Sequence, residues 1–195
     1  MKIYVIRHGQ SVANLRKEMA GWAQVPLSEL GHEQARSLSP YLRNIKFDKI
    51  YSSDLLRSIQ TAQDALGHDM FDRSVKIREI SVGSLSGHTR VQCIEQYGDQ
   101  FINDNRKQDF SAYGGENQLM IGSRVFEFVR DLEKLENVTN VAVFGHEGTV
   151  HQMLNYVFDT HLEIRNIRVA NASVTLFAYE KGCWKLVTFG FTGEL

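Results

Sequence analysis

Cysteine and proline are scarce in this sequence, which has only two of each among its 195 residues. Cys93 and Cys183 could form at most one disulfide, and neither belongs to a CxxC motif. The apolar run before Arg7 is too short for a signal peptide, and no later run approaches the length that spans a membrane. These absences predict a reduced, cytoplasmic protein without a membrane partner.

Excess charge is also missing, because 22 Lys and Arg residues are balanced by 23 Asp and Glu residues. The basic residues are scattered, so neither nucleic acid nor an anionic membrane surface is an expected partner. By contrast, 43% of the residues are hydrophobic, which is enough to build a full core. No linker is visible, and a single domain is expected over residues 1–195.

Strand-like apolar runs alternate with helical periodicity along the chain. This alternation predicts an α/β fold, with a mostly parallel sheet covered by helices on both faces. Strands are expected at residues 3–6, 48–53, 74–80, 140–145, 172–180 and 183–189. The last two flank Lys181-Gly182, a hairpin signal that would add an antiparallel edge.

The expected helices differ in how clearly their ends are marked. They cover residues 35–45, 55–66, 114–135 and 149–158. Pro40 should kink or shorten the first, and Ser53 or Asp54 is the expected cap of the second. Residues 89–113 are polar and weakly periodic, which indicates a short helix and a loop within a covering segment of about residues 81–115.

Reactive side chains follow several of the predicted strands. Arg7 and His8 end the first strand, Arg57 lies near the start of the helix after the second, Glu79 ends the third, and His146 follows the fourth. In parallel sheets the carboxyl ends of the strands open on one edge. We therefore expect these side chains to meet in one pocket.

Each of these residues also has a simpler explanation. A lone histidine at a strand end is usually a satisfied polar residue, Arg57 could be a solvated helix residue, and Glu79 could pair with a nearby arginine. Two strand-tip histidines that each adjoin a glycine are harder to explain in this way, since glycine lets a ligand approach the backbone closely.

Together these residue types favour phosphoryl chemistry. Guanidinium groups bind phosphate through charge-assisted hydrogen bonds. A neutral imidazole such as that of His8 can attack phosphorus while the cations stabilise the equatorial oxygens. Glu79 could protonate the leaving oxygen and then activate water. Because cationic side chains would supply the electrostatic stabilisation, neither a metal nor another cofactor is expected.

Six blocks of the sequence carry a family resemblance: "RHGQSVAN", "PLSELGHEQA", "SSDLLRSIQTA", "REISVGSLSG", "GGEN" and "FGHEG". In this order they resemble the histidine phosphatase superfamily, also called the phosphoglycerate mutase-like family. The ending "NASVTLFAYEKGCWKLV" also fits, so the resemblance covers essentially the whole chain. It implies the family's three-layer α/β sandwich and a small phosphorylated substrate; the oligomeric state stays open.

The resemblance also implies roles for individual residues. His8 would be the nucleophile that becomes phosphohistidine, and Glu79 the proton donor. The phosphate pocket would contain Arg7, Arg57 and His146. Further phosphate or substrate contacts are implied for the first loop, at Asn14, Ser11, Gln10 and Gly21, although a structural role for Gly21 is an equal alternative.

Departures from the family pattern bear on the reaction. In cofactor-dependent mutases the acid lies in a Glu-Arg-His-Tyr-Gly run, whereas this chain has Glu79-Ile80-Ser81-Val82-Gly83. The Arg and Tyr that grip a mutase substrate are absent, so hydrolysis of a phosphomonoester is expected and mutase activity is the alternative. Glu147 replaces the glycine that many members have after the second histidine. It could bond His146, or cap the following helix, which is the role expected here.

Two further classes of protein deserve comparison. "HEGTVH" nearly matches the zinc motif H-E-x-x-H, but its histidines, His146 and His151, are one residue too far apart to share a helix face. A non-catalytic phosphate-binding protein is the other alternative. Such a protein has no need for both a histidine nucleophile and a proton donor.

Overall fold

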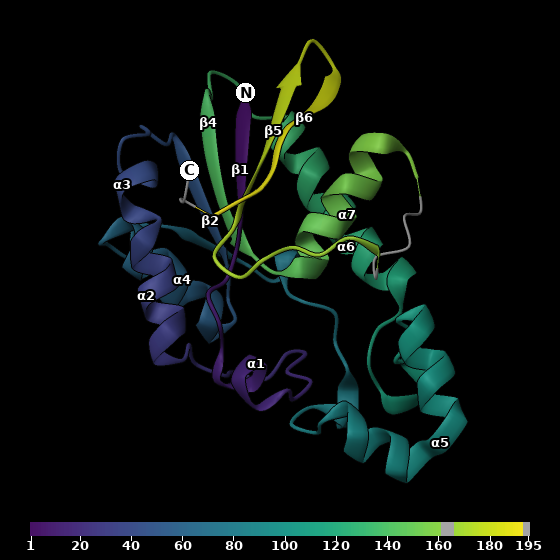
Figure 1. Ribbon diagram of the computed structural model, residues 1–195. Helices are drawn as coiled ribbons and strands as arrows, with labels where there is room; N and C mark the ends of the chain where they lie inside the picture. Colours follow the sequence, from purple (N-terminus) through teal and green to yellow (C-terminus); the bar gives the residue numbers. More distant parts are fainter. Residues whose placement is uncertain (161–165, 193–195) are drawn as a thin grey trace.

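A computed structural model of the protein describes residues 1–160 and 166–192 and contains a six-stranded sheet (Figure 1). Its strand order is β3-β2-β4-β1-β5-β6. The bounds are β1 (Lys2–Arg7), β2 (Lys49–Ser53), β3 (Asp72–Ser74), β4 (Asn140–Gly145), β5 (Val174–Glu180) and β6 (Cys183–Phe191). β1 to β4 pair in parallel, whereas β5 is antiparallel to both β1 and β6. The predicted sheet with its antiparallel edge is confirmed.

Helices lie on both faces of this sheet. Their bounds are α1 (Val12–Arg16), α2 (Glu29–Ser37), α3 (Ser39–Leu42), α4 (Leu56–Leu66), α5 (Arg90–Lys107), α6 (Gln118–Glu133) and α7 (Glu147–Phe158). Figure 1 shows α2, α3 and α4 beside one face, and α6 and α7 beside the other. Within the ranges that the structure describes, no helix has the length and apolar character needed to cross a bilayer.

The side chains of β1 show how both faces are buried. Ile3 and Val5 belong to one hydrophobic cluster, together with residues of α6 and α7. Tyr4 and Ile6 belong to a second cluster, together with residues of α3 and α4. Because successive side chains of a strand point to opposite faces, this alternation places the sheet between two helical layers.

Pro40 divides the first predicted helix, as expected. α2 ends at Ser37, and α3 begins at Ser39 with Pro40 in its first turn. Proline fits there because the N–H groups of a first turn have no intrahelical partner. Leu38 and Leu42 stay fully buried, so the apolar face continues across the break.

The predicted strand over residues 74–80 is wrong. β3 ends at Ser74, and Val75–Ile77 form a 3₁₀ helix instead. Val75 is exposed, whereas Ile77 and Ile80 are buried. Residues 75 and 77 would share one face of a strand, so their opposite burial does not fit the two-residue period of a strand.

The prediction for residues 89–113 also needs correction. α5 has 18 residues, and it is bent at Gly98, whose φ of 57° and ψ of −137° are not helical. A capping box between Thr89 and Gln92 starts the helix. The bend interrupts the apolar periodicity, which explains why the sequence pattern indicated only a short helix.

Neither Ser53 nor Asp54 caps α4. The N-cap position is Leu55, whose side chain makes no capping hydrogen bond. Instead, the Ser53 hydroxyl contacts His146, and the Asp54 carboxylate pairs with Arg78. Both polar side chains are therefore used in tertiary contacts at the carboxyl end of β2.

Candidate active site

His8 and His146 lie together at the carboxyl edge of the sheet. β1 and β4 are neighbours in a register that pairs Arg7 with Gly145, and the His8 N–H donates to the Gly145 carbonyl at 3.0 Å. The two imidazole rings are 5.2 Å apart between centroids and tilted by 62°. Both histidines are buried. The structure thus brings together two side chains that are 138 positions apart in the sequence (146 − 8).

Burial keeps both imidazoles neutral. It is the main cause that lowers the pKa of His8 well below its usual value, and the charges of Arg57 and Arg7 lower it further. Burial and Arg57 likewise lower the pKa of His146. His8 Nδ1 lies 2.6 Å from the Gly9 carbonyl, which can only accept a hydrogen bond. The proton of neutral His8 is therefore on Nδ1, and Nε2 keeps its lone pair.

Arg57 is buried rather than solvated, with 1% of its surface exposed. Its guanidinium donates to the carbonyls of Gly21 at 2.9 Å and Ala23 at 3.1 Å. Burial lowers its pKa to about 10, while nearby Glu79 acts in the opposite direction. Arg57 is still a cation at pH 7, and the hydrogen bonds that hold it go to neutral carbonyls.

Arg7 has a different environment. Its guanidinium donates to the Val169 carbonyl and forms an ion pair with Glu147, with 3.3 Å between Nη2 and Oε2. Glu147 lies in the first turn of α7, as predicted for an acidic residue there, although the N-cap position itself is occupied by His146. The Glu147 carboxylate, for which a hydrogen bond to His146 was the alternative prediction, contacts Arg7 instead.

Glu79 reaches the site from a loop that follows the 3₁₀ helix Val75–Ile77. One carboxylate oxygen accepts from the Ile80 N–H at 2.9 Å, and the other from the Gly148 N–H at 3.4 Å. A β-carbon on Gly148 would collide with the Glu79 carboxylate. The close approach of the acid to the first turn of α7 therefore requires glycine at this position.

A cavity of about 380 Å³ opens beside Glu79. Its apolar part comes from isoleucines, and its polar part from residues of several elements. The lining includes Ile80, Ile121, Ile167, Arg90, Gln108, Gln118, Glu147, His151 and Arg168. Arg90 and Gln108 lie at the two ends of α5, so this helix contributes to the cavity from both of its ends.

The side chains of the first loop make local contacts. Ser11 caps α1 and forms a capping box with Asn14, which is exposed. The Gln10 side chain accepts from the Ser28 hydroxyl at 2.8 Å. Gly21 has a φ of +48°, and a β-carbon there would collide with Val82. The contact of Gly21 with the site is made by its backbone carbonyl, which accepts a hydrogen bond from Arg57.

Several residues at the site escaped prediction from sequence. Ser53 Oγ lies 2.9 Å from His146 Nε2, and its place at the end of a strand could have revealed it. Asn171 donates to the His8 carbonyl at 3.0 Å. Trp22 and Arg124 both donate to the Glu79 carbonyl, but nothing in their sequence surroundings marks them.

The histidines of the zinc-like motif do not act together. His146 Nε2 faces Ser53, while His151 Nε2 lies 2.9 Å from the Ile167 carbonyl. Among residues 1–160 and 166–192, no group of three or more His, Cys, Asp or Glu side chains is arranged to hold a metal.

The model of the histidine phosphatase superfamily (branch 1) matches residues 3–192. The chain belongs to this superfamily. The family resemblance of the six sequence blocks is confirmed, and so is the fold class that it implied.

Similar members of the superfamily include both phosphatases and mutases. A broad-specificity phosphatase of Saccharomyces cerevisiae is 29% identical over 188 residues, which cover 93% of this chain and 80% of the yeast protein. A 2,3-bisphosphoglycerate-dependent phosphoglycerate mutase of Latilactobacillus sakei is 30% identical, with 80% and 83% covered. The fold is similar to that of a mycobacterial glucosyl-3-phosphoglycerate phosphatase, with a TM-score of 0.86, 23% identity, and 97% and 98% of the chains covered.

The buried histidines should make stability depend on pH. Because their pKa values are lowered in the folded state, the unfolded chain binds more protons below about pH 6.5, and the free energy of unfolding should fall as the pH is lowered through that value. Each histidine contributes at most about 1.4 kcal/mol per pH unit. The unfolding free energy, measured with urea between pH 7.5 and 5 in buffers without phosphate, should depend less steeply on pH in His8→Gln and His146→Gln than in the wild type. Substitution of the exposed His88 in His88→Gln should leave the slope of the unfolding free energy against pH as in the wild type. Equal slopes in all four proteins would contradict the prediction.

Proposed function

We propose that this protein is a phosphatase that hydrolyses a small phosphomonoester through a phosphohistidine on His8. The neutral His8 imidazole supports this proposal, because its Nδ1 is engaged with the Gly9 carbonyl and its Nε2 lone pair is available for attack. Arg57 and Arg7 lie close enough to influence its protonation. A neutral nucleophile between two cations suits attack on an anionic phosphoryl group.

The observation that carries the proposal concerns two of the buried nitrogen atoms that have no hydrogen-bond partner in the described structure. They are Nε of Arg7 and Nδ1 of His146. Leaving buried polar groups unpaired is costly, and such groups call for an explanation. A phosphate oxygen would pair with Arg7 Nε. It would also pair with His146 Nδ1 when the Ser53 hydroxyl donates to Nε2 and the ring proton lies on Nδ1.

The proposed reaction has two steps. First, His8 Nε2 forms a bond to phosphorus, the bond to the ester oxygen breaks, and protonated Glu79 gives its proton to that oxygen. Second, water attacks phosphorus and loses a proton to the Glu79 carboxylate while the P–N bond breaks. Inorganic phosphate leaves, and both His8 and Glu79 return to their initial states. Arg7, Arg57 and His146 would stabilise the charge on the equatorial oxygens in both steps.

The cavity beside Glu79 is the proposed place for the alcohol part of the substrate, since the acid must reach the leaving oxygen. The segment of about residues 81–115 would cover it, because Arg90 and Gln108 line the cavity from α5. No metal or other cofactor has a role in this scheme. Asn14, Ser11 and Gln10 remain proposed contacts for phosphate or substrate.

His8→Ala should reduce the turnover of p-nitrophenyl phosphate at least about a thousandfold, because no nucleophile remains. A ³²P-labelled substrate should leave an acid-labile, base-stable label on His8 of the wild-type protein and none on the variant. Exposed His88→Ala is the matched control and should retain both properties. Activity should also persist after treatment with a chelator. Turnover undiminished in His8→Ala would refute the scheme.

Mutase activity is the second candidate, favoured by the identity to a phosphoglycerate mutase. Against it, the position after the acid is Ile80, a buried residue that lines the cavity without offering a charge. We expect 3-phosphoglycerate to be hydrolysed rather than isomerised, with or without added 2,3-bisphosphoglycerate. Appearance of 2-phosphoglycerate faster than inorganic phosphate would instead identify a mutase.

Glu147 should weaken phosphate binding, because its carboxylate already occupies Arg7. Glu147→Gln removes this competing negative charge, so the inhibition constant of inorganic phosphate should fall about five- to tenfold, equivalent to about 1 kcal/mol. Glu147→Asp retains the charge and should change the constant less. Exposed Glu136→Gln serves as the control for loss of a carboxylate elsewhere. Weaker inhibition of Glu147→Gln by phosphate would show that the ion pair does not compete.

A further inference from the structure

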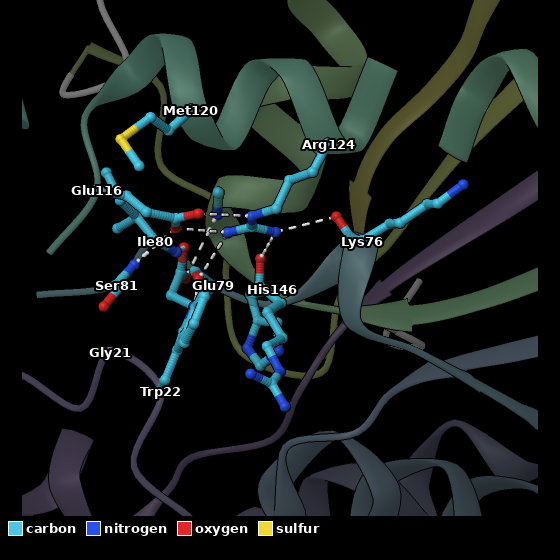
Figure 2. A network of polar contacts seen from close by, with 12 residues as sticks. Gly21, Trp22, Lys76, Glu79, Ile80, Ser81, Glu116, Met120, Arg124 and His146 are labelled. Carbon is cyan, nitrogen blue, oxygen red and sulfur yellow. Dashed lines mark hydrogen bonds and ion pairs between the residues drawn. The ribbon is translucent and has the colours of Figure 1, made fainter. Parts of the chain in front are cut away.

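Arg124 of α6 holds the loop that carries Glu79. Its guanidinium donates to the backbone carbonyls of Lys76 at 2.9 Å, Arg78 at 2.6 Å and Glu79 at 2.9 Å. The same group forms two parallel bonds of 2.9 Å with the Glu116 carboxylate. Figure 2 shows these bonds converging on one side chain. All the donor nitrogens of Arg124 are thus used, with three bonds going to the residues at and just before the acid.

Glu116 connects this group to the covering segment. Its Oε2 also accepts from the Ser81 N–H at 2.9 Å, and its own N–H donates to the Ser81 carbonyl at 2.8 Å. Ser81 begins the covering segment, and Glu116 directly follows its last residue. Glu116 is buried, with 6% of its surface exposed. The Arg124–Glu116 ion pair therefore joins both ends of that segment to the loop of the acid.

Trp22 also bonds the loop that carries Glu79. Its indole N–H donates to the Glu79 carbonyl at 2.7 Å, so this carbonyl accepts from both Trp22 and Arg124. The Arg78 and Arg124 guanidinium carbons lie 4.8 Å and 5.9 Å from the centre of the indole ring. Figure 2 shows Glu79 between Trp22 and the Arg124–Glu116 pair. Trp22 is 40% exposed, so a substitution there removes little of the core.

We propose that Arg124, bound to Glu116 and assisted by Trp22, is a positioning residue that holds Glu79 where it can protonate the leaving oxygen. This inference rests on the proposed function, because Arg124 would act only through the proton transfers of Glu79, of which kcat/KM reports the first, where Glu79 acts as an acid. Nothing in it requires Arg124 to touch the substrate. The catalytic group is Glu79, whose carboxylate direction depends on a backbone fixed at its own carbonyl.

Substrates with different leaving groups can test whether Arg124 positions Glu79. An alkyl alcohol leaves poorly as an alkoxide and depends on a general acid, whereas p-nitrophenolate leaves readily without one. A displaced Glu79 would therefore slow the cleavage of propyl phosphate much more than that of p-nitrophenyl phosphate. General damage to the fold or to the phosphate pocket would slow both reactions alike.

The experiment measures kcat/KM for propyl phosphate and p-nitrophenyl phosphate in six proteins: wild type, Arg124→Lys, Trp22→Phe, Glu79→Gln, the double variant Glu79→Gln/Arg124→Lys and the control Arg130→Lys. Lysine keeps the charge but cannot make the same set of bonds. Phenylalanine keeps the ring and removes one donor to the Glu79 carbonyl. Arg130→Lys is the matched control, since Arg130 is an exposed residue of the same helix.

For Arg124→Lys, we expect kcat/KM for propyl phosphate to fall about a hundredfold, and that for p-nitrophenyl phosphate less than about threefold. Trp22→Phe should show the same selectivity with a loss of about tenfold for propyl phosphate. In the Glu79→Gln background, Arg124→Lys should have no further effect on propyl phosphate, because the group through which it acts is gone. Arg130→Lys should match the wild type.

The contrary outcomes are distinct. Equal losses for both substrates in Arg124→Lys and Trp22→Phe, or full additivity with Glu79→Gln, would overturn the positioning role while leaving the proposed function intact. If Glu79→Gln itself shows no selectivity for the leaving group, the assignment of the acid is wrong and the inference with it. If the wild type hydrolyses neither ester, the proposed function fails first. Should Arg124→Lys not fold, Trp22→Phe still decides the question.

Discussion

The parallel pairing of β1 with β4 is the constraint on which the site depends. It places Arg7 opposite Gly145, and the next residues of both strands are His8 and His146. The pairing lies in the middle of a sheet that is covered by helices on both faces, and the two imidazoles that follow it are buried. Burial lowers the pKa of both rings. The same packing that stabilises the sheet thus provides a neutral imidazole at physiological pH.

Positive charge around these rings is compensated unevenly. Arg57 is buried and held by two backbone carbonyls, which orient the guanidinium without neutralising it. Arg7 is paired with Glu147. Burying a cation without a carboxylate partner carries a large desolvation cost. A dianionic phosphate would offset that cost at Arg57, while it would compete with Glu147 at Arg7. The net affinity for phosphate in the proposed scheme is set by this difference between the two arginines.

The proposed acid belongs to a different part of the structure from the nucleophile. Glu79 lies in a loop between the 3₁₀ helix Val75–Ile77 and the covering segment, and its carboxylate accepts from the Gly148 N–H at the start of α7. Phosphatases and mutases of the superfamily are similar to this chain to nearly the same extent. Their reactions share the attack on phosphorus and differ in the acceptor that follows. In the proposed scheme this difference in reaction would therefore arise at the cavity and at the segment proposed to cover it, rather than at the paired histidines.

The sequence by itself determined the α/β class, most of the sheet and the meeting of His8 with His146. Strand periodicity is a local signal, and parallel strands place their carboxyl ends at one edge of the sheet. Only the tertiary structure decided three other features: the path of residues 74–80, the length of α5, and the contacts of Ser53 and Glu147. So did Arg124 and Trp22, which are an ordinary helix residue and a loop residue in the sequence. Their partners are backbone carbonyls far along the chain, and backbone groups are the same in every residue. No residue pattern can mark such a contact, so only the folded arrangement shows it.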